Sequence, residues 1–563
     1  MTDGFREDTA EAIADLKRQV KALRREASRQ ACDLSRVLPR FFRPADIPAC
    51  NGDSEKPVDI LLTVKNSYDF LQPCLESIFA NTDVPFRLVI SDNNSSDPRT
   101  PEFLKQVRDE HAGKVQLFLQ ETDLGYAGGV NFLLSHSAND AILVNADVVV
   151  PPGWASRLLW PIRHSGKKVA SAAPFTNAAS MIAFPDVFLD DILFDDMSLE
   201  RLDKVFQAAR PTASFAFPYS PGFCMALSRS AVEEVGLFDA ATFSPIYGEE
   251  VDWCCRATRK GYSHLLAANV FVYHKHGGTM RDDPSVERER LREKHARIIE
   301  ARYPWYSNAV MDFIDNPELL AFRSMLTLLA STEVANGCAV FFSSRDAAAR
   351  TRCFRRAGEA RAAIVVSQDP DTGRGQVTYR FKRHHGAFEG PGVNWAIKLL
   401  YRLKISEIVV DDLSGWDHVP MRTLHTLQRL RRFSGAPLSV VLNNHYPVCP
   451  AWRLRTPDGR DCGVPADTTA CAPCLARQAH SPDYPVWPDE FIRIKKYTWL
   501  RAEDLLAWDG TADASFGQWR GLVWGRFLRE CADSIIVPAR ADAALLERVY
   551  PGVEDKIVFE SGM

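Results

Sequence analysis

Short apolar runs alternate with polar stretches of helical periodicity from Val58 onward. The first four runs are VDILLTV, FRLVISD, VQLFLQ and AILVNAD. Strands that alternate with helices in this way are typical of a parallel sheet built from βα units. The pattern therefore predicts an α/β domain over residues 56–310, with a mostly parallel central sheet whose carboxyl edge carries the ligand site.

Polar side chains follow three of these runs. Asn66 comes after the first run, Asp92, Asn93 and Asn94 end or follow the second, and Asp147 follows the fourth. A carboxylate at the end of a strand, such as that of Asp147, can bind a hard divalent cation. A helix cap or a turn aspartate is the commoner alternative for a single residue of this kind.

Two further groups of residues offer candidate chemistry later in the chain. Glu249, Glu250 and Asp252 form an acidic cluster, and like charges this close raise the proton affinity of at least one carboxylate, which suits a general base. A solvated acidic turn is the alternative. His274 and His276 follow another apolar run, where they would be either a metal ligand or a surface pair on a loop.

The N-terminal segment carries a separate pattern. Apolar residues recur at three- and four-residue steps over residues 8–38, with lysine and arginine on the other faces, which predicts an amphipathic, coiled-coil-like helix within residues 1–45. Docking on its own domain or pairing in a homo-oligomer is favoured over attachment to a membrane surface. A polar stretch rich in turn residues then predicts a linker over 43–57.

A second α/β series begins at Cys338 with the runs CAVFFSS, AAIVVSQ, ISEIVVDD, LSVVLNN and SIIVPA. A chain of 563 residues is too long for one hydrophobic core, so we expect a second domain over residues 335–563. With 46% hydrophobic residues, 25% charged residues and a net charge of −4, the chain offers no electrostatic reason to bind nucleic acid.

The sequence contains no apolar run long enough to span a bilayer and no apolar core of a signal peptide near its N-terminus. We expect a cytoplasmic protein, with peripheral attachment to the inner face of the plasma membrane left open by the basic N-terminal segment. Thirteen cysteines in such a chain are reduced thiols or metal ligands rather than disulfides.

Four of the cysteines, Cys449, Cys462, Cys471 and Cys474, have the spacing C-x12-C-x8-C-x2-C. Four thiolates that end in a CxxC pair suit a structural Zn²⁺. Buried thiols, or a redox-sensitive pair at Cys471 and Cys474, are the alternatives.

The order of the motifs in the first domain resembles the family 2 glycosyltransferases of the GT-A type, in particular the bacterial branch that builds surface polysaccharides. The strings that carry this resemblance include LVISDNNSSD, DLGYAGGVNFLL, LVNADVVVPPGW, PGFCMALSRSAVEEVGLFD, YGEEVDWCCRA and VYHKHGGT. The resemblance implies a nucleotide-sugar donor, such as a UDP- or dTDP-sugar. The implied donor-binding residues are Thr63, Val64, Asn66, Asp92, Asn94, Gly125, Asn131 and Asn145.

The same resemblance implies the catalytic roles. Glu250 takes the place of the base that removes the proton of the acceptor hydroxyl, with inversion at the anomeric carbon, and Asp252 and Glu249 stay as alternatives. Asp147 matches the second acid of the Asp-X-Asp metal motif, whose first position is Asn145 here, and His274 matches the metal-contacting histidine. The cofactor would be Mn²⁺ or Mg²⁺.

The implied function is transfer of a hexose or deoxyhexose to a glycan or lipid-linked glycan in cell-surface polysaccharide synthesis. A carbohydrate-binding or scaffold protein with impaired catalysis is the alternative, suggested by Asn145. The second domain resembles the N-terminal lobe of a family 4 glycosyltransferase of the GT-B class, with Asn443 and Asn444 in place of a His-Asp pair. The chain would then be part of a longer bifunctional enzyme, or would keep this lobe for acceptor binding or docking.

Overall fold

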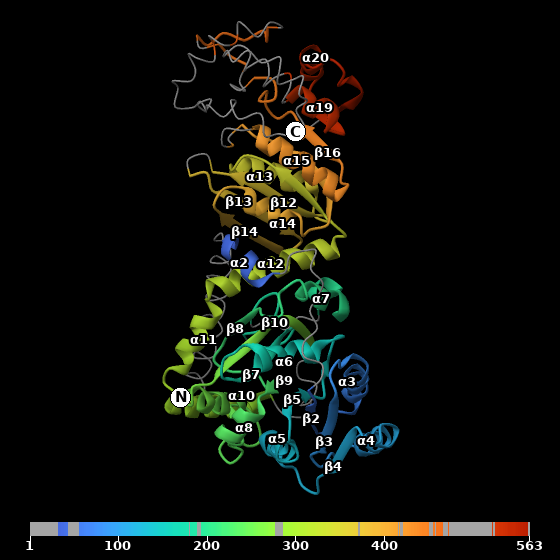
Figure 1. Ribbon diagram of the computed structural model, residues 1–563, viewed down its shortest axis with the longest axis vertical. Helices are drawn as coiled ribbons and strands as arrows, with labels where there is room; N and C mark the ends of the chain where they lie inside the picture. Colours follow the sequence, from blue (N-terminus) through green and yellow to red (C-terminus); the bar gives the residue numbers. More distant parts are fainter. Residues whose placement is uncertain are drawn as a thin grey trace, which may run out of the picture. The chain divides into compact units, whose positions relative to one another are not determined.

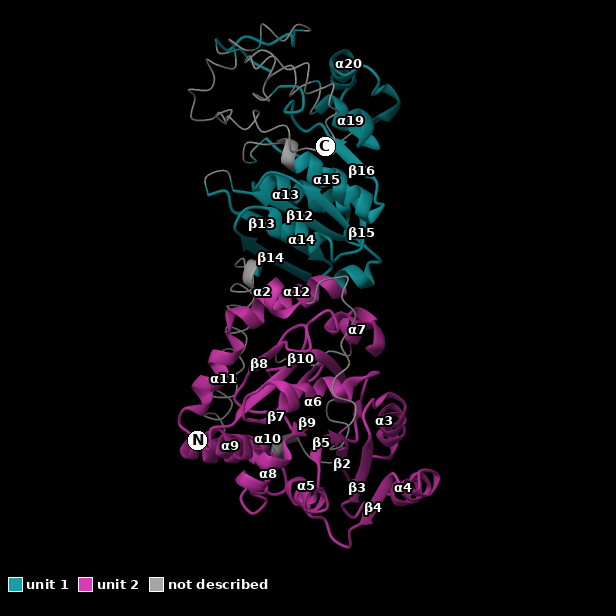
Figure 2. Cartoon of the chain, in the orientation of Figure 1, with its two compact units in different colours: residues 1–36, 331–563 teal, residues 37–330 magenta. Residues whose placement is uncertain are grey.

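The structure is a computed structural model. It describes residues 32–42, 56–179, 181–187, 193–275, 285–369, 372–414, 416, 420–449, 454–456, 458–465, 471, 474, 521 and 524–560. The chain divides into two compact units, one formed by residues 37–330 and the other by residues 1–36 and 331–563 (Figure 2). Two helices, α2 (Leu34–Phe41) and α12 (Pro317–Val334), cross the limits of these units along the chain.

The unit of residues 37–330 contains a nine-stranded, mostly parallel sheet (Figure 1). In spatial order its main path is β4 (Val115–Leu119), β3 (Phe86–Asp92), β2 (Val58–Val64), β5 (Asp140–Asn145), β9 (Cys224–Leu227), β7 (Val169–Thr176), β10 (Ser263–His274) and β6 (Val148–Val149). Strand β8 (Ser214–Ala216) pairs with β10. The strands β4, β3, β2 and β5 are parallel, whereas β9 runs antiparallel to both of its neighbours.

Helices connect and cover these strands. They are α3 (Tyr68–Asn81), α4 (Arg99–Glu110), α5 (Gly125–Ser135), α6 (Trp154–His164), α7 (Leu199–Phe206), α8 (Arg229–Val235), α9 (Glu249–Arg259), α10 (Ser285–Arg302) and α11 (Tyr306–Ile314), with the 3₁₀ turn η1 (Phe194–Asp196). Strands β2 and β7 are buried along nearly their whole length, which explains why their sequences are nearly continuous apolar runs.

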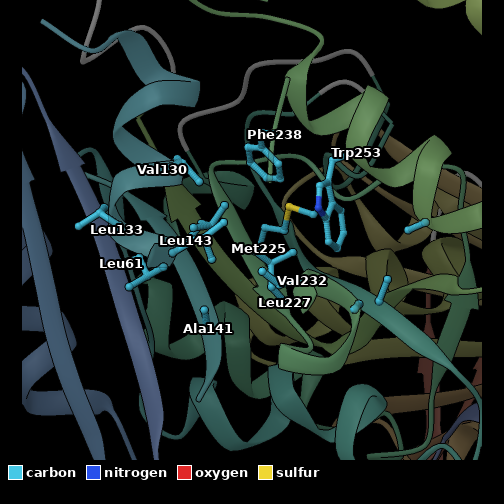
Figure 3. Close-up of a cluster of buried hydrophobic side chains, with 14 of the residues drawn as sticks. Leu61, Val130, Leu133, Ala141, Leu143, Met225, Leu227, Val232, Phe238 and Trp253 are labelled. Carbon is cyan, nitrogen blue, oxygen red and sulfur yellow. The ribbon is translucent and has the colours of Figure 1, made fainter. Parts of the chain in front are cut away.

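One hydrophobic core fixes the helix that carries the acidic cluster. Side chains of the central strands, such as Leu61, Leu143 and Met225, pack against α5, α8 and α9 (Figure 3). Trp253 of α9 is fully buried in this core, and its Nε1 donates a hydrogen bond to the carbonyl oxygen of Gly236 at 2.8 Å. Because α9 begins at Glu249, this packing sets where the acidic residues lie.

The second unit is also an α/β domain, which confirms the predicted fold class. Its strand order is β1 (Cys32–Asp33), β14 (His384–Gly390), β13 (Gly375–Phe381), β12 (Ala362–Gln368), β11 (Cys338–Phe342), β15 (Ile405–Val410), β16 (Leu438–Val441), β17 (Ser534–Val537) and β18 (Ile557–Phe559). The strands from β12 to β18 along this order are parallel, and β13 and β14 add an antiparallel hairpin.

Five helices of this unit are described, together with the 3₁₀ turn η6 (Glu554–Lys556). They are α13 (Ala347–Ala357), α14 (Asn394–Leu400), α15 (Pro420–Ser434), α19 (Arg526–Glu530) and α20 (Arg540–Val549). In the part of the chain that the structure describes, no helix has the length and apolar character needed to cross a membrane.

The structure describes only the end of the segment predicted as a helix over residues 8–38, where Leu34–Phe41 form helix α2 and the two residues before them do not. Residues 8–31 lie outside the described part of the chain. Cys32 and Asp33 form strand β1, which pairs in parallel with Phe388 and Glu389 at the edge of the second sheet. An unpaired sheet edge offers backbone hydrogen bonds that a helix cannot use, and this tertiary pairing ends the helical periodicity at these two residues.

Candidate active site

The carboxyl ends of three neighbouring strands bring the predicted donor-binding residues to one edge of the first sheet. In the register of β2 and β3, Val64 lies opposite Asp92, and in the register of β2 and β5, Thr63 lies opposite Asn145. The hydroxyl of Thr63 is buried and has no hydrogen-bond partner among the described residues.

Two of the residues after these strands stabilise the loops around them. Asp92 accepts hydrogen bonds from the backbone N–H and the hydroxyl of Ser95, and burial raises the pKa of this carboxyl group. Asn66 has a φ of 51°, and its Oδ1 accepts from the backbone N–H of Ser96 at 2.7 Å. Asn94 also has a positive φ, of 56°, and is exposed. Asn66 therefore closes a turn, while Asp92 lies at the strand end.

The glycine-rich segment at the start of α5 packs close to these strands. Gly125 has a φ of 66°, and a Cβ at this position would lie 3.2 Å from the carbonyl oxygen of Pro245. At Gly129 a Cβ would lie 2.7 Å from both Thr63 Cγ2 and Asn93 Nδ2. Glycine at these two positions is what lets the helix approach the sheet and the turn before α9.

Asn131 has a structural role instead of the predicted donor-binding role. Its Nδ2 donates to the carbonyl oxygen of Phe238, and its Oδ1 accepts from the N–H of the same residue, both at 2.9 Å. Both polar atoms of the carboxamide are thus used to hold the segment before α9 against α5.

Asp147 and His274 form the candidate metal pair. Asp147 is 4% exposed, and its Oδ1 lies 3.4 Å from Nε2 of His274 without a hydrogen-bond partner among the described residues. His274 Nδ1 lies 2.9 Å from the carbonyl oxygen of Ala178. Because a carbonyl oxygen can only accept a hydrogen bond, Nδ1 carries the proton. In the neutral ring, Nε2 then has a lone pair, and this atom faces Asp147. The ring also stacks on Phe223, with 4.8 Å between centroids.

This pair fits a divalent cation. Ligands about 2.1 Å from an octahedral ion and at right angles to each other lie about 3 Å apart, close to the separation of the two side chains. The described residues include no group of three or more His, Cys, Asp or Glu side chains that could hold a metal ion. Oxygen atoms of a diphosphate and water would therefore complete the shell, as is usual for Mg²⁺ bound to nucleotides.

The acidic cluster separates into residues with different tasks. Asp252 is 1% exposed and accepts from Arg256, Arg302 and the hydroxyl of Tyr303, each at 2.8 Å. Because both of its oxygens are bound in this way, Asp252 holds α9 and α10 together. The sequence kept Asp252 as an alternative to Glu250 because it does not show these partners.

Glu249 and Glu250 form a close pair at the start of α9. Burial raises the pKa of Glu249 well above its ordinary value, and the charge of Glu250 adds to the rise. Burial also raises the pKa of Glu250, although backbone N–H groups and Glu249 oppose the rise. Glu249 is 2% exposed, whereas Glu250 is partly exposed as a residue although its Oε2 is buried.

Tyr126 shows that these groups converge, and the sequence analysis did not single it out. Burial raises the pKa of its phenol well above the ordinary value, and the charges of nearby carboxylates add to the rise. These carboxylates are Glu249, Glu250 and Asp147. The hydroxyl donates to the carbonyl oxygen of Gly222 at 2.9 Å. Tyr126, within the DLGYAGG string, therefore lies within electrostatic range of Asp147 and of both glutamates.

The cysteines of the second unit do not form the predicted zinc site. Among the described residues, which include Cys449, Cys462, Cys471 and Cys474, no group of three or more His, Cys, Asp or Glu side chains could hold a metal ion. Sequence spacing alone does not bring thiolates to tetrahedral positions, and here it fails to do so.

The asparagines that stand in place of a His-Asp pair have carboxylate partners in the second unit. Asn443 Nδ2 donates to the carbonyl oxygen of Asp411 at 3.0 Å, and Asn444 Nδ2 donates to Oδ1 of Asp412 at 2.9 Å. These bonds join the ends of β15 and β16.

Part of the first domain is similar to a known family of enzymes. Residues 59–236 match the family model described as Glycosyl transferase family 2. The matched segment includes Asp92 and Asp147 and ends before Glu249 and His274. No curated protein matches the chain significantly.

Solved structures with some likeness to the chain are also glycosyltransferases. The mannosyltransferase PcManGT from Pyrobaculum calidifontis in complex with GDP-Man and Mn²⁺ is 16% identical, with 53% of this chain and 80% of that chain covered and a TM-score of 0.35. GalNAc-T7 with UDP, GalNAc and Mn²⁺ is 16% identical, with 48% and 54% covered and a TM-score of 0.33. Because these TM-scores are low, the assignment depends on the family match and the site.

Proposed function

We propose that residues 37–330 form an inverting glycosyltransferase that depends on a divalent cation, Mn²⁺ or Mg²⁺, and uses a nucleotide-sugar donor. The observation that carries this proposal is the pair of Asp147 and His274, 3.4 Å apart, in the same unit as the two glutamates at the start of α9. One end of this arrangement suits a cation and a diphosphate, and the other end suits a base.

The transfer needs a base near the acceptor and a held diphosphate near the donor. Glu250 accepts the proton of the acceptor hydroxyl as that oxygen forms a bond to the anomeric carbon. The bond from the anomeric carbon to the diphosphate breaks on the opposite side, which inverts the configuration and releases the nucleoside diphosphate. A bound cation would neutralise the charge that develops on the leaving group.

The raised pKa of Glu250 suits this task. A base works best when its pKa lies near the working pH, and burial moves the pKa of Glu250 upward from its ordinary value of 4.5 toward that range. Activity should therefore be lost as the pH falls through this raised pKa, because protonated Glu250 cannot accept the acceptor proton.

The motif strings favour a particular context for the reaction. They suggest a UDP- or dTDP-sugar as donor and a glycan or lipid-linked glycan of a bacterial cell surface as acceptor, handled in the cytoplasm or at the inner face of the plasma membrane. The second unit would serve as an acceptor-binding or docking lobe of GT-B type, and the N-terminal segment as a contact between copies of the chain.

The test is release of nucleoside diphosphate from a panel of nucleotide sugars, with Mn²⁺, Mg²⁺ or EDTA, in the full-length protein. We expect turnover with one donor, its loss in EDTA, and its loss in Asp147→Asn and Glu250→Gln variants that keep the wild-type melting temperature. Glu121→Gln, which changes an exposed carboxylate, serves as the matched control and should be fully active.

Two results would contradict the proposal. Donor binding by thermal shift without turnover under any condition would favour a sugar-binding or scaffold protein. Equal turnover in Glu250→Gln and in the wild type would remove Glu250 from its role as base.

A further inference from the structure

A tight turn precedes the two glutamates of α9. Tyr247 has a φ of 76° and Gly248 a φ of 95°, so two consecutive residues have left-handed backbone conformations. Such a conformation costs free energy for a residue with a side chain, so it persists only where surrounding contacts hold it. The same turn contacts the glycine-rich segment, because Tyr126 N–H donates to the carbonyl oxygen of Pro245 at 2.9 Å.

His295 of α10 holds the carbonyl side of this turn. Its Nδ1 lies 3.0 Å from the carbonyl oxygen of Ile246 and 2.7 Å from that of Tyr247. Carbonyl oxygens only accept, so Nδ1 must carry the proton and donate to both. The ring is 1% exposed and meets Phe243 edge to face at 5.3 Å between centroids. A buried donor in this position fixes the plane of both peptide groups.

The two peptide groups that His295 holds come directly before the glutamates, because α9 begins at Glu249. The backbone N–H of Tyr247 belongs to the peptide group of the Ile246 carbonyl, and it lowers the pKa of Glu249 against the larger effect of burial. The backbone N–H of Gly248 belongs to the peptide group of the Tyr247 carbonyl, and it lowers the pKa of Glu250 in the same way. The orientation of these two peptide groups therefore affects both glutamates.

We propose that His295 is a positioning residue for the reaction, which aligns Glu249 and Glu250 by holding the two peptide groups of the turn between Ile246 and Gly248. The proposal rests on the proposed function, because it concerns how the base is placed. His295 does not touch substrate; it acts through the turn.

Three variants of the full-length protein test this role. His295→Phe keeps an aromatic ring beside Phe243 and removes the donor, whereas His295→Asn keeps an N–H donor near the position of Nδ1. Ile299→Ala is the matched control, because Ile299 is a buried residue of the same helix that contributes only packing. We expect kcat to fall about 10²-fold in His295→Phe, as misplacement of a catalytic group by about 1 Å does, with the donor KM nearly unchanged.

Further readouts separate positioning from simple loss of stability. His295→Asn should restore most of kcat, and Ile299→Ala should lower the melting temperature while kcat stays near the wild-type value. In His295→Phe the acid limb of the pH profile should move to higher pH, because the glutamates lose aligned N–H donors that favour their charged form.

Hydrogen exchange of the segment 243–250 provides a readout without turnover. The segment should exchange faster in His295→Phe than in the wild type, the His295→Asn variant and the Ile299→Ala variant. If the wild type has no transferase activity but this exchange pattern holds, the proposed function fails and the holding of the turn stands. Equal exchange and equal kcat in His295→Phe and the wild type would overturn the positioning role, as would an equal loss of kcat in Ile299→Ala.

Discussion

Replacing Glu249 by glutamine should stabilise the protein at neutral pH. The side chain is 2% exposed, and its Oε2 is buried without a hydrogen-bond partner among the described residues. Burial and the charge of Glu250 raise its pKa well above 4.5 in the folded state. Glutamine keeps the shape of the side chain, carries no charge, and supplies an N–H that can donate to Glu250.

The sign and size of the effect follow from proton linkage. In the unfolded chain the carboxyl group ionises near 4.5, whereas in the folded protein it ionises only at higher pH. Its contribution to stability is therefore fully present below pH 4.5 and is lost as the pH rises through the raised folded pKa. A buried polar group without a partner costs about 1–3 kcal/mol, so we expect a gain of about 2 kcal/mol above that pKa.

Calorimetry of the wild type and the variant at pH 4.5, 6.0 and 7.5 measures this gain. For a domain of about 150–250 residues, 2 kcal/mol corresponds to a rise of about 4–8 °C in melting temperature, and for the larger unit here to the lower part of that range. The exposed Glu121→Gln variant should show no such rise. A gain that is the same at pH 4.5 and 7.5, or that also occurs in Glu121→Gln, would refute the reasoning from the buried carboxylate.

Three further predictions concern residues around the site. Asp252→Asn should lower the unfolding free energy by about 1–3 kcal/mol, measured by denaturant titration, because its arginine partners are 27% and 36% exposed and solvent screens part of the loss. Gly129→Ala should lower the unfolding free energy by about 1–3 kcal/mol in the same assay, because the new Cβ would lie 2.7 Å from Thr63 Cγ2. Gly128→Ala should lower it clearly less, because its Cβ would lie 3.2 Å from Leu124 Cβ. Burial lowers the pKa of His264 to about 4, so this residue contributes stability that is present above pH 6.5 and is lost as the pH falls through 4. Between pH 6.5 and 4, the loss of unfolding free energy should be about 3 kcal/mol smaller in His264→Gln than in the wild type, as measured by melting curves. If the unfolding free energy of the variant falls as much as that of the wild type, His264 is not the source of the loss.

The apolar runs predicted the parallel strands well because these strands are buried on both faces. VDILLTV and FRLVISD coincide with β2 and β3 as the structure has them. Strand β9, with the sequence CMAL, is only four residues long and pairs antiparallel with both β5 and β7. No local pattern in so short a run shows that it enters a sheet between two strands far away in the sequence.

In the candidate site, too, the sequence indicated some residues but not the tertiary contacts of others. The order of the motifs led to Asp147 and His274, whose side chains lie 3.4 Å apart, and to Glu250, whose charge and that of Asp147 both raise the pKa of Tyr126. The partners of Asp252 and Asn131 could not be anticipated, because Arg302 and Phe238 are distant along the chain. A sequence shows which charges and amides are present, whereas only tertiary contacts decide which of them are already used.

Helix α10 shows why such partners escape a reading of the sequence. Its sequence, SVERERLREKHARIIEAR, is highly charged and is typical of a helix on the surface. Yet His295, Ile299 and Arg302 recur at three- and four-residue steps on one face, and this face holds the turn before α9, the adjoining core and Asp252. A polar helix that binds through hydrogen bonds has no apolar stripe to reveal its buried face, so its role in placing the glutamates follows from the contacts alone.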